Sequence, residues 1–310
     1  MTVNLGYACI NETLKKQKIS CNRGMIKRTF QAKGIAYASE LALANVIDLK
    51  KIIEWNNANG ISVYRMTSCL FPWFSDYDIF DMPDIDAIVD VMSEAGKIAM
   101  DAGQRLSFHP GPFNCLGSHN EKVVLKTIAE LDAHAAQMDL MGLPVSPQAK
   151  INIHIGGAYG EHDKALARFC DNFKRLAPST QARLTVENDD RQSMFSTKML
   201  YDGVSKHIGI PIVFDSHHHD LGPQDLDYHD AFHLARQTWI DRGVKQQCHH
   251  SNSRKHYEDP SCKAQAHSDW YYTPFEAYDK DVDVVLECKK KELALFKYKE
   301  DFQKKILTAA

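Results

Sequence analysis

The sequence lacks the features that would place it in a membrane or a secretory pathway. None of its 310 residues fall in an apolar run of the roughly 20 that a membrane span requires. Its first residues form neither a basic leader nor a signal-peptide core. We therefore expect an intracellular protein with no membrane partner, cytoplasmic or, if the source is eukaryotic, nuclear.

Several sequence motifs are missing as well. The eight cysteines form no CxxC pair and no zinc-finger spacing, and a chain of this length does not need disulfides, so we expect free thiols. The phosphate-loop patterns GxxxxGK[ST] and GxGxxG are absent, as is the nucleophile elbow GxSxG. The glycines of residues 154–160 therefore indicate a close strand-to-helix turn rather than a phosphate loop.

The net charge is only −3, which argues weakly against nucleic acid, but the charge is unevenly distributed. Residues 1–34 hold seven basic side chains against one acid, a net charge of +6. A second basic run, Lys289–Lys291, follows the last apolar segment. Each run predicts either a solvated surface or a contact with phosphates.

What the sequence does contain is a series of short apolar runs that end on residues able to bind metal. The runs are 105–109, 151–154, 183–187, 210–215, 244–249 and 282–287, and they end on His109, His154, Glu187, Asp215, His249 and Glu287. Successive side chains of a strand point to opposite faces, so each run separates an apolar face from a polar one. In a closed parallel barrel the polar residues at the strand ends would meet at the mouth.

The order of the elements predicts such a barrel. Strands are expected near 3–8, 61–68, 105–111, 150–157, 183–189, 210–216, 244–251 and 282–289. Amphipathic helices are expected at 39–57, 85–102, 120–141, 162–175, 193–207 and 228–240. Eight strands with helical crossovers predict one α/β domain over residues 1–310, a (β/α)8 TIM barrel with a helical tail at 292–310. The long connections 9–38, 69–84 and 252–275 would surround its mouth, at the C-terminal face of the strands.

The polar residues at the strand ends predict a metal centre. To the six strand-end residues above we add the histidines of the tract Asp215–Asp220 and His267 in the loop after the seventh strand. Imidazole and carboxylate without thiolate suit Mn²⁺, Zn²⁺, Co²⁺ or Fe²⁺. The number of ligands favours two or three ions with bridging carboxylates. The inward register of Lys245 and Gln247 favours His249 over His250, which stays the alternative.

Eight short motifs in this order and spacing resemble the UV damage endonucleases. They are Tyr7-Ala-Cys-Ile-Asn11, Tyr64-Arg-Met-Thr-Ser68, Ser107-Phe-His-Pro-Gly111, His154-Ile-Gly-Gly-Ala-Tyr-Gly-Glu161, Glu187-Asn-Asp189, Asp215-Ser-His-His-His219, Ala266-His-Ser-Asp269 and Glu287-Cys-Lys-Lys-Lys291. The resemblance runs from about residue 3 to residue 291. It implies a barrel of the xylose-isomerase and endonuclease IV type that holds up to three divalent ions, usually Mn²⁺, with Zn²⁺, Co²⁺ or Mg²⁺ as alternatives.

The resemblance also implies an activity, a partner and residue roles. Family members incise double-stranded DNA immediately 5′ of cyclobutane dimers and 6-4 products, which starts excision repair, and we expect a monomer. The implied metal ligands are His109, His154, Glu187, Asp215, His218, His249, His267 and Glu287. Glu187, Glu287 and Lys289 would be catalytic, Tyr7 and Asn11 would contact the extruded lesion, and Pro112 and Phe113 would probe the duplex.

The chain departs from the family pattern at three places. Pro112-Phe113 stands where Gln-Tyr is usual, Gln247 stands where some members have lysine, and Ser68-Cys69 stands where some have histidine. Three alternatives stay open. They are an abasic-site endonuclease of the endonuclease IV type, a divalent-metal sugar isomerase, and a damage-binding module without ions.

Overall fold

Eight parallel strands form the centre of the molecule. The computed structural model describes residues 2–303. The strands are β1 (Val3–Ala8), β2 (Val63–Arg65), β3 (Arg105–Ser107), β4 (Ile151–Ile153), β5 (Leu184–Glu187), β6 (Ile212–Val213), β7 (Gln247–His250) and β8 (Val282–Leu286). Hydrogen bonds order them as β3-β2-β1-β8-β7 and β4-β5-β6. Single bridges, Phe108 to Ile151 and Asp215 to His249, join the two sheets into a ring. The predicted α/β barrel is confirmed.

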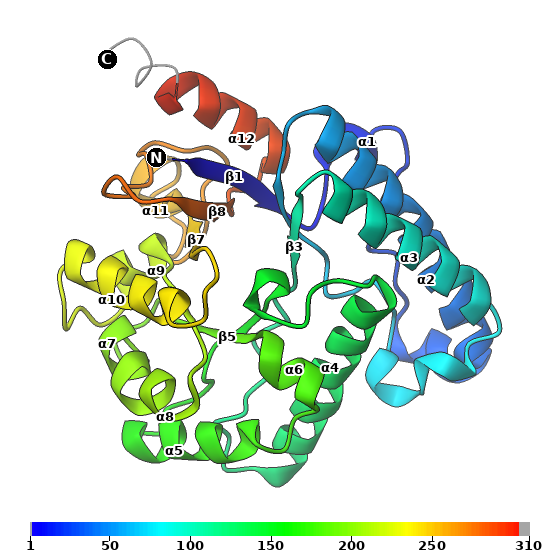
Figure 1. Ribbon diagram of the computed structural model, residues 1–310, viewed down its shortest axis with the longest axis horizontal. Helices are drawn as coiled ribbons and strands as arrows, with labels where there is room; N and C mark the ends of the chain where they lie inside the picture. Colours follow the sequence, from blue (N-terminus) through cyan, green and yellow to red (C-terminus); the bar gives the residue numbers. More distant parts are fainter. Residues whose placement is uncertain (1, 304–310) are drawn as a thin grey trace.

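Helices surround this ring (Figure 1). The longer ones are α2 (Lys27–Ala58), α3 (Ile85–Asp101), α4 (Glu121–Leu140), α5 (His162–Phe173), α10 (Tyr228–Ile240) and α12 (Lys291–Tyr298). The shorter ones are α1 (Glu12–Lys15), α6 (Pro178–Arg183), α7 (Thr197–Leu200), α8 (Lys206–Ile208), α9 (Ser216–Leu221) and α11 (Arg254–Tyr257). A π-helical turn, Tyr201–Ser205, divides the helix expected at 193–207. The expected C-terminal tail begins as α12 and a turn at Lys299–Gln303, and its residues 304–310 lie outside the described part.

The start of α2 differs from the expectation of a loop up to residue 38. The helix begins at Lys27 and is kinked at Gly34, whose φ of 66° lies in the left-handed region that glycine adopts without strain. Phe30, before the kink, stacks on Trp73 with ring centroids 6.0 Å apart and an angle of 15° between the ring planes. This contact joins the first and second long connections. The apolar periodicity of a single segment cannot predict such a contact between two segments.

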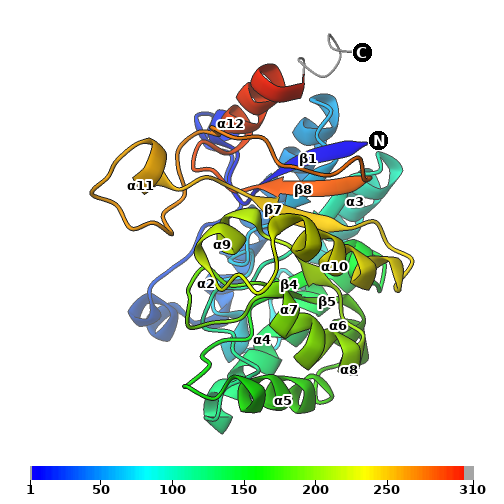
Figure 2. The ribbon, with the colours of Figure 1, turned by 90° about the vertical axis from the view of Figure 1, so that its left-hand side faces the viewer.

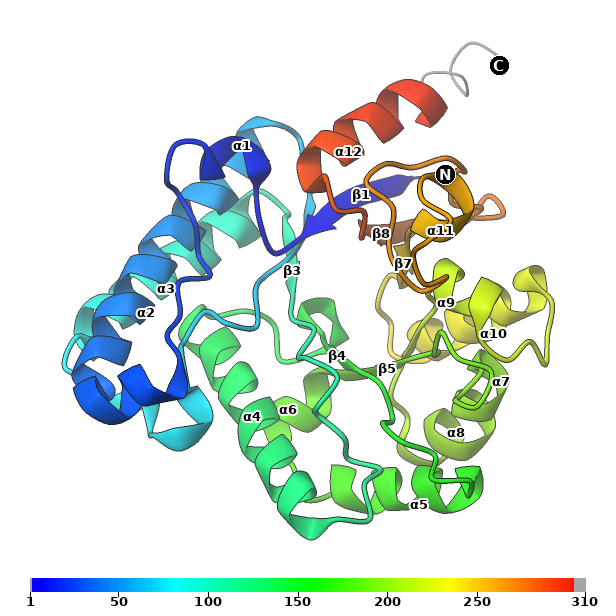
Figure 3. The ribbon, with the colours of Figure 1, turned by 180° about the vertical axis from the view of Figure 1, so that it is seen from behind.

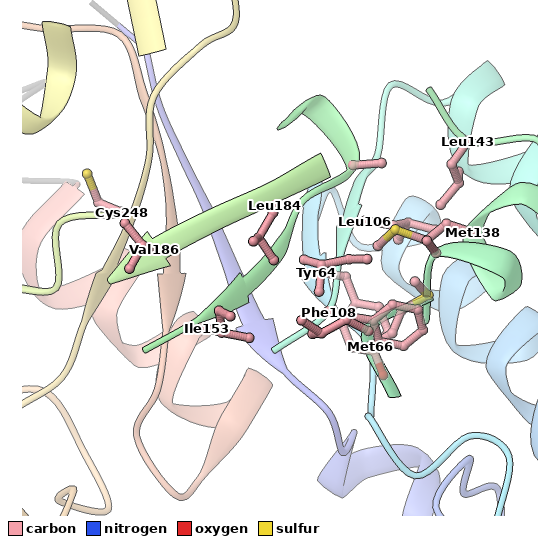
Figure 4. Packing of buried hydrophobic residues seen from close by; sticks show 14 of the residues in the cluster. Tyr64, Met66, Leu106, Phe108, Met138, Leu143, Ile153, Leu184, Val186 and Cys248 are labelled. Atoms are coloured by element: carbon pink, nitrogen blue, oxygen red, sulfur yellow. The ribbon is translucent and has the colours of Figure 1, made fainter. Parts of the chain in front are cut away.

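The outer faces of the strands pack against the helices. Leu106, Phe108, Leu184 and Val186 are each no more than 2% exposed, as expected for the outward face (Figure 4). The N-terminal end of the barrel is closed by Asp283, which pairs with Arg105 at 3.0 Å and with Lys245 at 2.8 Å. The polar interior opens toward the carboxyl ends of the strands, where the side chains of His109 and His154 are 15% and 22% exposed.

The side view places the long connections at that open end. In Figure 2 the strands point to the left, and the α11 segment and the first turns of α2 project on that side. All eight cysteines are free, as predicted. In the described residues, no helix has the length and apolar character to cross a membrane.

Candidate metal centre

The carboxylate of Glu187, at the end of β5, is the middle of a cluster of histidines. Its Oε2 atom lies 3.1 Å from Nε2 of His109 and 3.0 Å from Nδ1 of His249. Its Oε1 atom lies 3.1 Å from Nδ1 of His218 and 4.0 Å from Nε2 of His154. These residues lie at or shortly after the carboxyl ends of five different strands, so closure of the barrel brings together groups that are far apart in the sequence.

Two further carboxylates complete the arrangement. Oε1 of Glu287 lies 3.1 Å from Nδ1 of His249. Asp215, two residues after β6, is fully buried. Ligand atoms within 4.8 Å of one another form three groups here, namely His109–Glu187–His249, His154–Glu187–His218 and Asp215–His249–Glu287. Glu187 and His249 are each shared by two groups, an arrangement typical of a centre that holds more than one ion.

The structure distinguishes the histidines that the sequence left ambiguous. In the tract after β6, His218 faces Glu187, whereas His217 lies beside His267 with ring centroids 5.4 Å apart. His249 faces the two glutamates. His250 points away, and its Nδ1 lies 2.7 Å from Oγ of Ser216.

His267 lies near these groups without belonging to one. It is in the loop after β7 and pairs with Ser253 through an isolated antiparallel bridge. Its Nδ1 atom is buried and has no hydrogen-bond partner in residues 2–303. Burial lowers the pKa of His267 to about 4, although Glu287 and Asp215 act to raise it, so the imidazole lies within electrostatic range of both.

The donor atoms of the cluster fit bound cations. Buried polar atoms normally have hydrogen-bond partners, and an orphaned one requires an explanation. Within the described part of the chain, Oδ2 of Asp215 and Nδ1 of His249 are buried without an aligned hydrogen bond. Carboxylate oxygens and imidazole nitrogens with free lone pairs are the ligands that borderline divalent metals prefer.

The charges of the cluster depend strongly on one another. Burial alone would raise the pKa of Glu187, but His249, His109 and His218 hold that pKa well below its usual range. Burial alone would lower the pKa of His154, but Asp189 and Glu187 outweigh it and raise the pKa to about 9. A carboxylate that stays ionised inside the barrel is suited to hold cations.

Four functional side chains were missed by the sequence reasoning. Arg65 pairs with Glu287, and Asn152 donates to Glu187. Lys150 lies 3.1 Å from Nε2 of His249, and Oδ1 of Asp189 lies 3.1 Å from Nδ1 of His154. The prediction of strand-end ligands omitted them because it considered only the last residue of each run. Alternate residues of a strand point to the same face, so the inward position of His154 would have indicated Asn152, two residues earlier.

The four residues expected to contact DNA fall into two classes. Phe113 is 89% exposed, and Pro112 beside it is also exposed. Tyr7 is fully buried, and its hydroxyl donates to Asn56 on α2 and accepts from Asn11. Asn11 also accepts from the Leu14 N–H and so caps α1. In this arrangement Tyr7 and Asn11 support the first long connection, and their contact with a lesion stays a prediction.

The basic residues lie at the rim of the open end. Lys289 is exposed, and its backbone N–H donates to the Ser268 carbonyl. In the first connection, Arg23 is held by Asp48 at 2.6 Å and Lys15 by Glu12 at 3.5 Å. The other basic side chains of that connection are exposed, and they are Lys16, Lys18, Lys27, Arg28 and Lys33.

A cavity of about 540 Å³ opens beside His109. The segments after β1, β2 and β3 form its walls, and its lining is predominantly apolar, with Met25, Phe71 and Trp73 among the lining residues. It therefore offers space for a planar or apolar group next to the metal centre.

Nearly the whole chain matches one protein family. The family model described as UV-endonuclease UvdE matches residues 3–309. The UV-damage endonuclease of Schizosaccharomyces pombe is 34% identical over 94% of this chain and 49% of the relative's length. The UV DNA damage endonuclease of Clostridium perfringens is 28% identical over 95% of this chain and 69% of the relative. The chain thus spans about half of the first relative.

Solved structures give the same result. The crystal structure of SacUVDE has 27% sequence identity and a TM-score of 0.83, and the match covers 98% of this chain and 99% of that one. Endonuclease IV from Thermus thermophilus, at 14% identity and a TM-score of 0.56 over 81% of this chain and 93% of that one, shares the fold. The chain belongs to the UV-endonuclease UvdE family.

Proposed function

We propose that this protein is a metal-dependent endonuclease that cleaves the phosphodiester bond immediately 5′ of ultraviolet photoproducts in double-stranded DNA. The observation that carries the proposal is the single carboxylate of Glu187 among four imidazoles at the mouth of the barrel, in a member of this family. The shared ligands support at least two ions. We propose Mn²⁺ because the family resemblance implies it, with Zn²⁺, Co²⁺ and Mg²⁺ as the alternatives.

Each ligand has a defined task in this proposal. His109, His154, Glu187, Asp215, His218, His249 and Glu287 would hold the ions, and His267 would join them from its loop. Bound divalent ions supply an activated water and stabilise the charge on the attacking and leaving oxygens. Arg65 fixes the carboxylate of Glu287, and Asn152 fixes that of Glu187. Lys289 would bind a phosphate at the rim, since its side chain is exposed there.

The surface around the centre suits a damaged duplex. Photoproducts weaken base pairing, so extrusion of the lesion requires less free energy there than at intact DNA. Phe113, at 89% exposure, would fill the gap in the base stack, as apolar wedges do in other DNA-bending proteins. The cavity beside His109 would accept the extruded bases. The exposed basic side chains would contact phosphates irrespective of sequence.

We further propose that the protein acts as a monomer in the compartment that holds the DNA.

The test is a nicking assay on three end-labelled duplexes that differ at one position, which carries a thymine dimer, an abasic site or no damage. We expect wild-type protein with Mn²⁺ to nick the dimer duplex 5′ of the lesion and leave a 3′-hydroxyl that a polymerase extends. The matched control is Glu187→Gln, which keeps the size of the side chain. Folded, metal-loaded protein that leaves the dimer duplex intact would contradict the proposal. Cleavage of the abasic duplex alone would assign the protein to the endonuclease IV activity instead.

A further inference from the structure

The ring of Tyr159 is exposed on a backbone that tyrosine rarely adopts. Its φ of 53° lies in the left-handed region, which disfavours residues other than glycine, asparagine and aspartate. The side chain is 51% exposed. A strained backbone persists where the surrounding structure imposes it, and such positions cluster at functional sites.

The ring is held in place although it is exposed. A Cβ atom at Gly157 would come within 2.9 Å of the tyrosine ring, so the ring packs closely on the backbone there. On another side the ring meets His119, with centroids 4.4 Å apart and the ring planes 77° apart. About half of this aromatic side chain is therefore open to solvent while its other contacts hold it in place.

This support is shared with the segment that carries Phe113. The Gly117 N–H donates to the Ile155 carbonyl at 3.2 Å. Gly156 packs so closely on Cys115 that a Cβ atom there would lie 2.7 Å from the sulfur. Figure 3 shows the chain after β3 and the chain after β4 running beside each other toward α4 and α5.

Both rings are close to the metal centre along the chain. Phe113 follows the ligand His109 by four residues, and Tyr159 follows the ligand His154 by five. The rings of the two histidines are 5.5 Å apart. An extended chain spans at most about 14 Å in four residues and about 18 Å in five, so both aromatic residues are within reach of the same lesion.

We propose that Tyr159 is a second stacking residue for damaged DNA, which packs its ring on a base or sugar beside the gap that Phe113 fills. The inference rests on the proposed function, because it needs a bent duplex at the mouth of the barrel. Stacking requires only an exposed aromatic face, which the bases of any sequence can meet. Two rings on one rigid support would hold the bend that brings the scissile phosphate to the metal ligands.

The test compares three variants in Mn²⁺-loaded, full-length protein. Tyr159→Asn removes the ring but suits a left-handed backbone, so the unfolding temperature should be unchanged or higher. Tyr159→Phe keeps the ring without the hydroxyl. Ile240→Asn is the control, because Ile240 is 53% exposed at the end of α10, just before β7 and so toward the closed end of the barrel. The probe is a dimer duplex with 2-aminopurine next to the lesion. Anisotropy measures binding, the fluorescence of 2-aminopurine reports on stacking beside the lesion, and nicking measures activity.

We expect Tyr159→Asn to weaken binding of the dimer duplex about tenfold. It should also reduce the change in 2-aminopurine fluorescence that accompanies binding. Tyr159→Phe and Ile240→Asn should behave as wild type. Equal binding by wild type and Tyr159→Asn would overturn the inference, as would the same loss in Tyr159→Phe. A parallel loss of bound metal in Tyr159→Asn would also overturn it, since the ring would then support the metal centre. Failure of wild-type protein to nick the dimer duplex would instead reject the proposed function.

Discussion

The Nζ atom of Lys150 lies 3.1 Å from Nε2 of His249 in the interior of the barrel. The other nitrogen of the same ring lies 3.0 Å from Glu187 and 3.1 Å from Glu287. Lys150 is fully buried, and this burial lowers its pKa to about 7. The lysine thus fixes which edge of the imidazole faces the carboxylates, as outer groups do around other metal centres.

We expect Lys150→Met to lower metal content and nicking activity while the protein stays folded. Methionine fills a similar volume, so the cavity term is small, but it cannot orient His249. Loss of such an orienting contact typically costs about 10- to 100-fold in affinity or activity. The measurements are metal per chain by mass spectrometry and kcat on the dimer duplex. Lys245→Met, at the closed end of the barrel, is the control and should keep its metal. Normal metal content in Lys150→Met would show that His249 needs no such support.

Glu187→Gln should remove most of the bound metal. The carboxylate takes part in two of the ligand groups, and an amide offers one neutral oxygen in place of an anion. Nicking should fall by more than about 100-fold, beyond the range typical of residues that only support a ligand. Circular dichroism checks the fold, and metal analysis with the nicking assay checks the prediction. A variant that kept full metal occupancy would contradict the shared role of this carboxylate.

Chelation should destabilise the folded protein. An ion that binds only the native state adds about 2.7 kcal/mol to the free energy of unfolding when its concentration is about 100 times Kd. Thermal unfolding in excess EDTA, and again after addition of Mn²⁺, measures this difference. The Asp215→Asn variant should show a smaller response because Asp215 belongs to one of the ligand groups. Identical curves with and without Mn²⁺ would mean that the cluster binds no ion.

Phe113→Ala should weaken nicking of the dimer duplex without affecting stability. The ring is 89% exposed, so its removal leaves no cavity in the protein. If the ring stacks in the gap left by the lesion, kcat/KM should fall about tenfold, and Phe113→Trp should restore it. Binding to an undamaged duplex serves as the control and should change little, because phosphate contacts carry that affinity. Equal nicking by Phe113→Ala and wild type would exclude the wedge.

The contribution of Asp48 to stability should disappear in acid. Burial raises the pKa of this carboxyl, but the Ser20 N–H, Lys51 and Arg23 outweigh burial and hold the pKa below its usual value. A depressed pKa in the folded state means that the stabilisation is present above the unfolded pKa, about 3.9, and is lost as the pH falls through the folded pKa.

Asp48→Asn should therefore lower the free energy of unfolding by about 1 kcal/mol at pH 7 and by progressively less below pH ~4. Urea unfolding of both proteins at pH 3, 5 and 7 gives the difference. A constant difference at all three pH values would show that charge plays no part. Arg23 belongs to the basic first connection. The salt dependence of DNA binding by Asp48→Asn therefore shows whether Asp48 positions that segment.

Much of the barrel was predictable because its strands alternate so regularly. The outward Leu106 and Phe108 and the inward His109 follow from a period of two residues, which is a property of the local chain. The start of α2 at Lys27, with its kink at Gly34, was not predicted, and the stacking of Phe30 on Trp73 joins two connections that are far apart in the sequence. The burial of Tyr7 was also missed, because a strand residue near the mouth can face either the pocket or a helix.

The sequence by itself determined which residue types end the strands, and hence the chemistry that the pocket offers. It also determined the barrel, because eight alternating runs with helical crossovers have few other ways to bury their apolar faces. Only the tertiary structure decided that His249 rather than His250 meets Glu187, and that Lys150 and Arg65 orient the ligands. Those relations are distances between side chains separated by dozens of residues, and they arise only when the ring of strands closes.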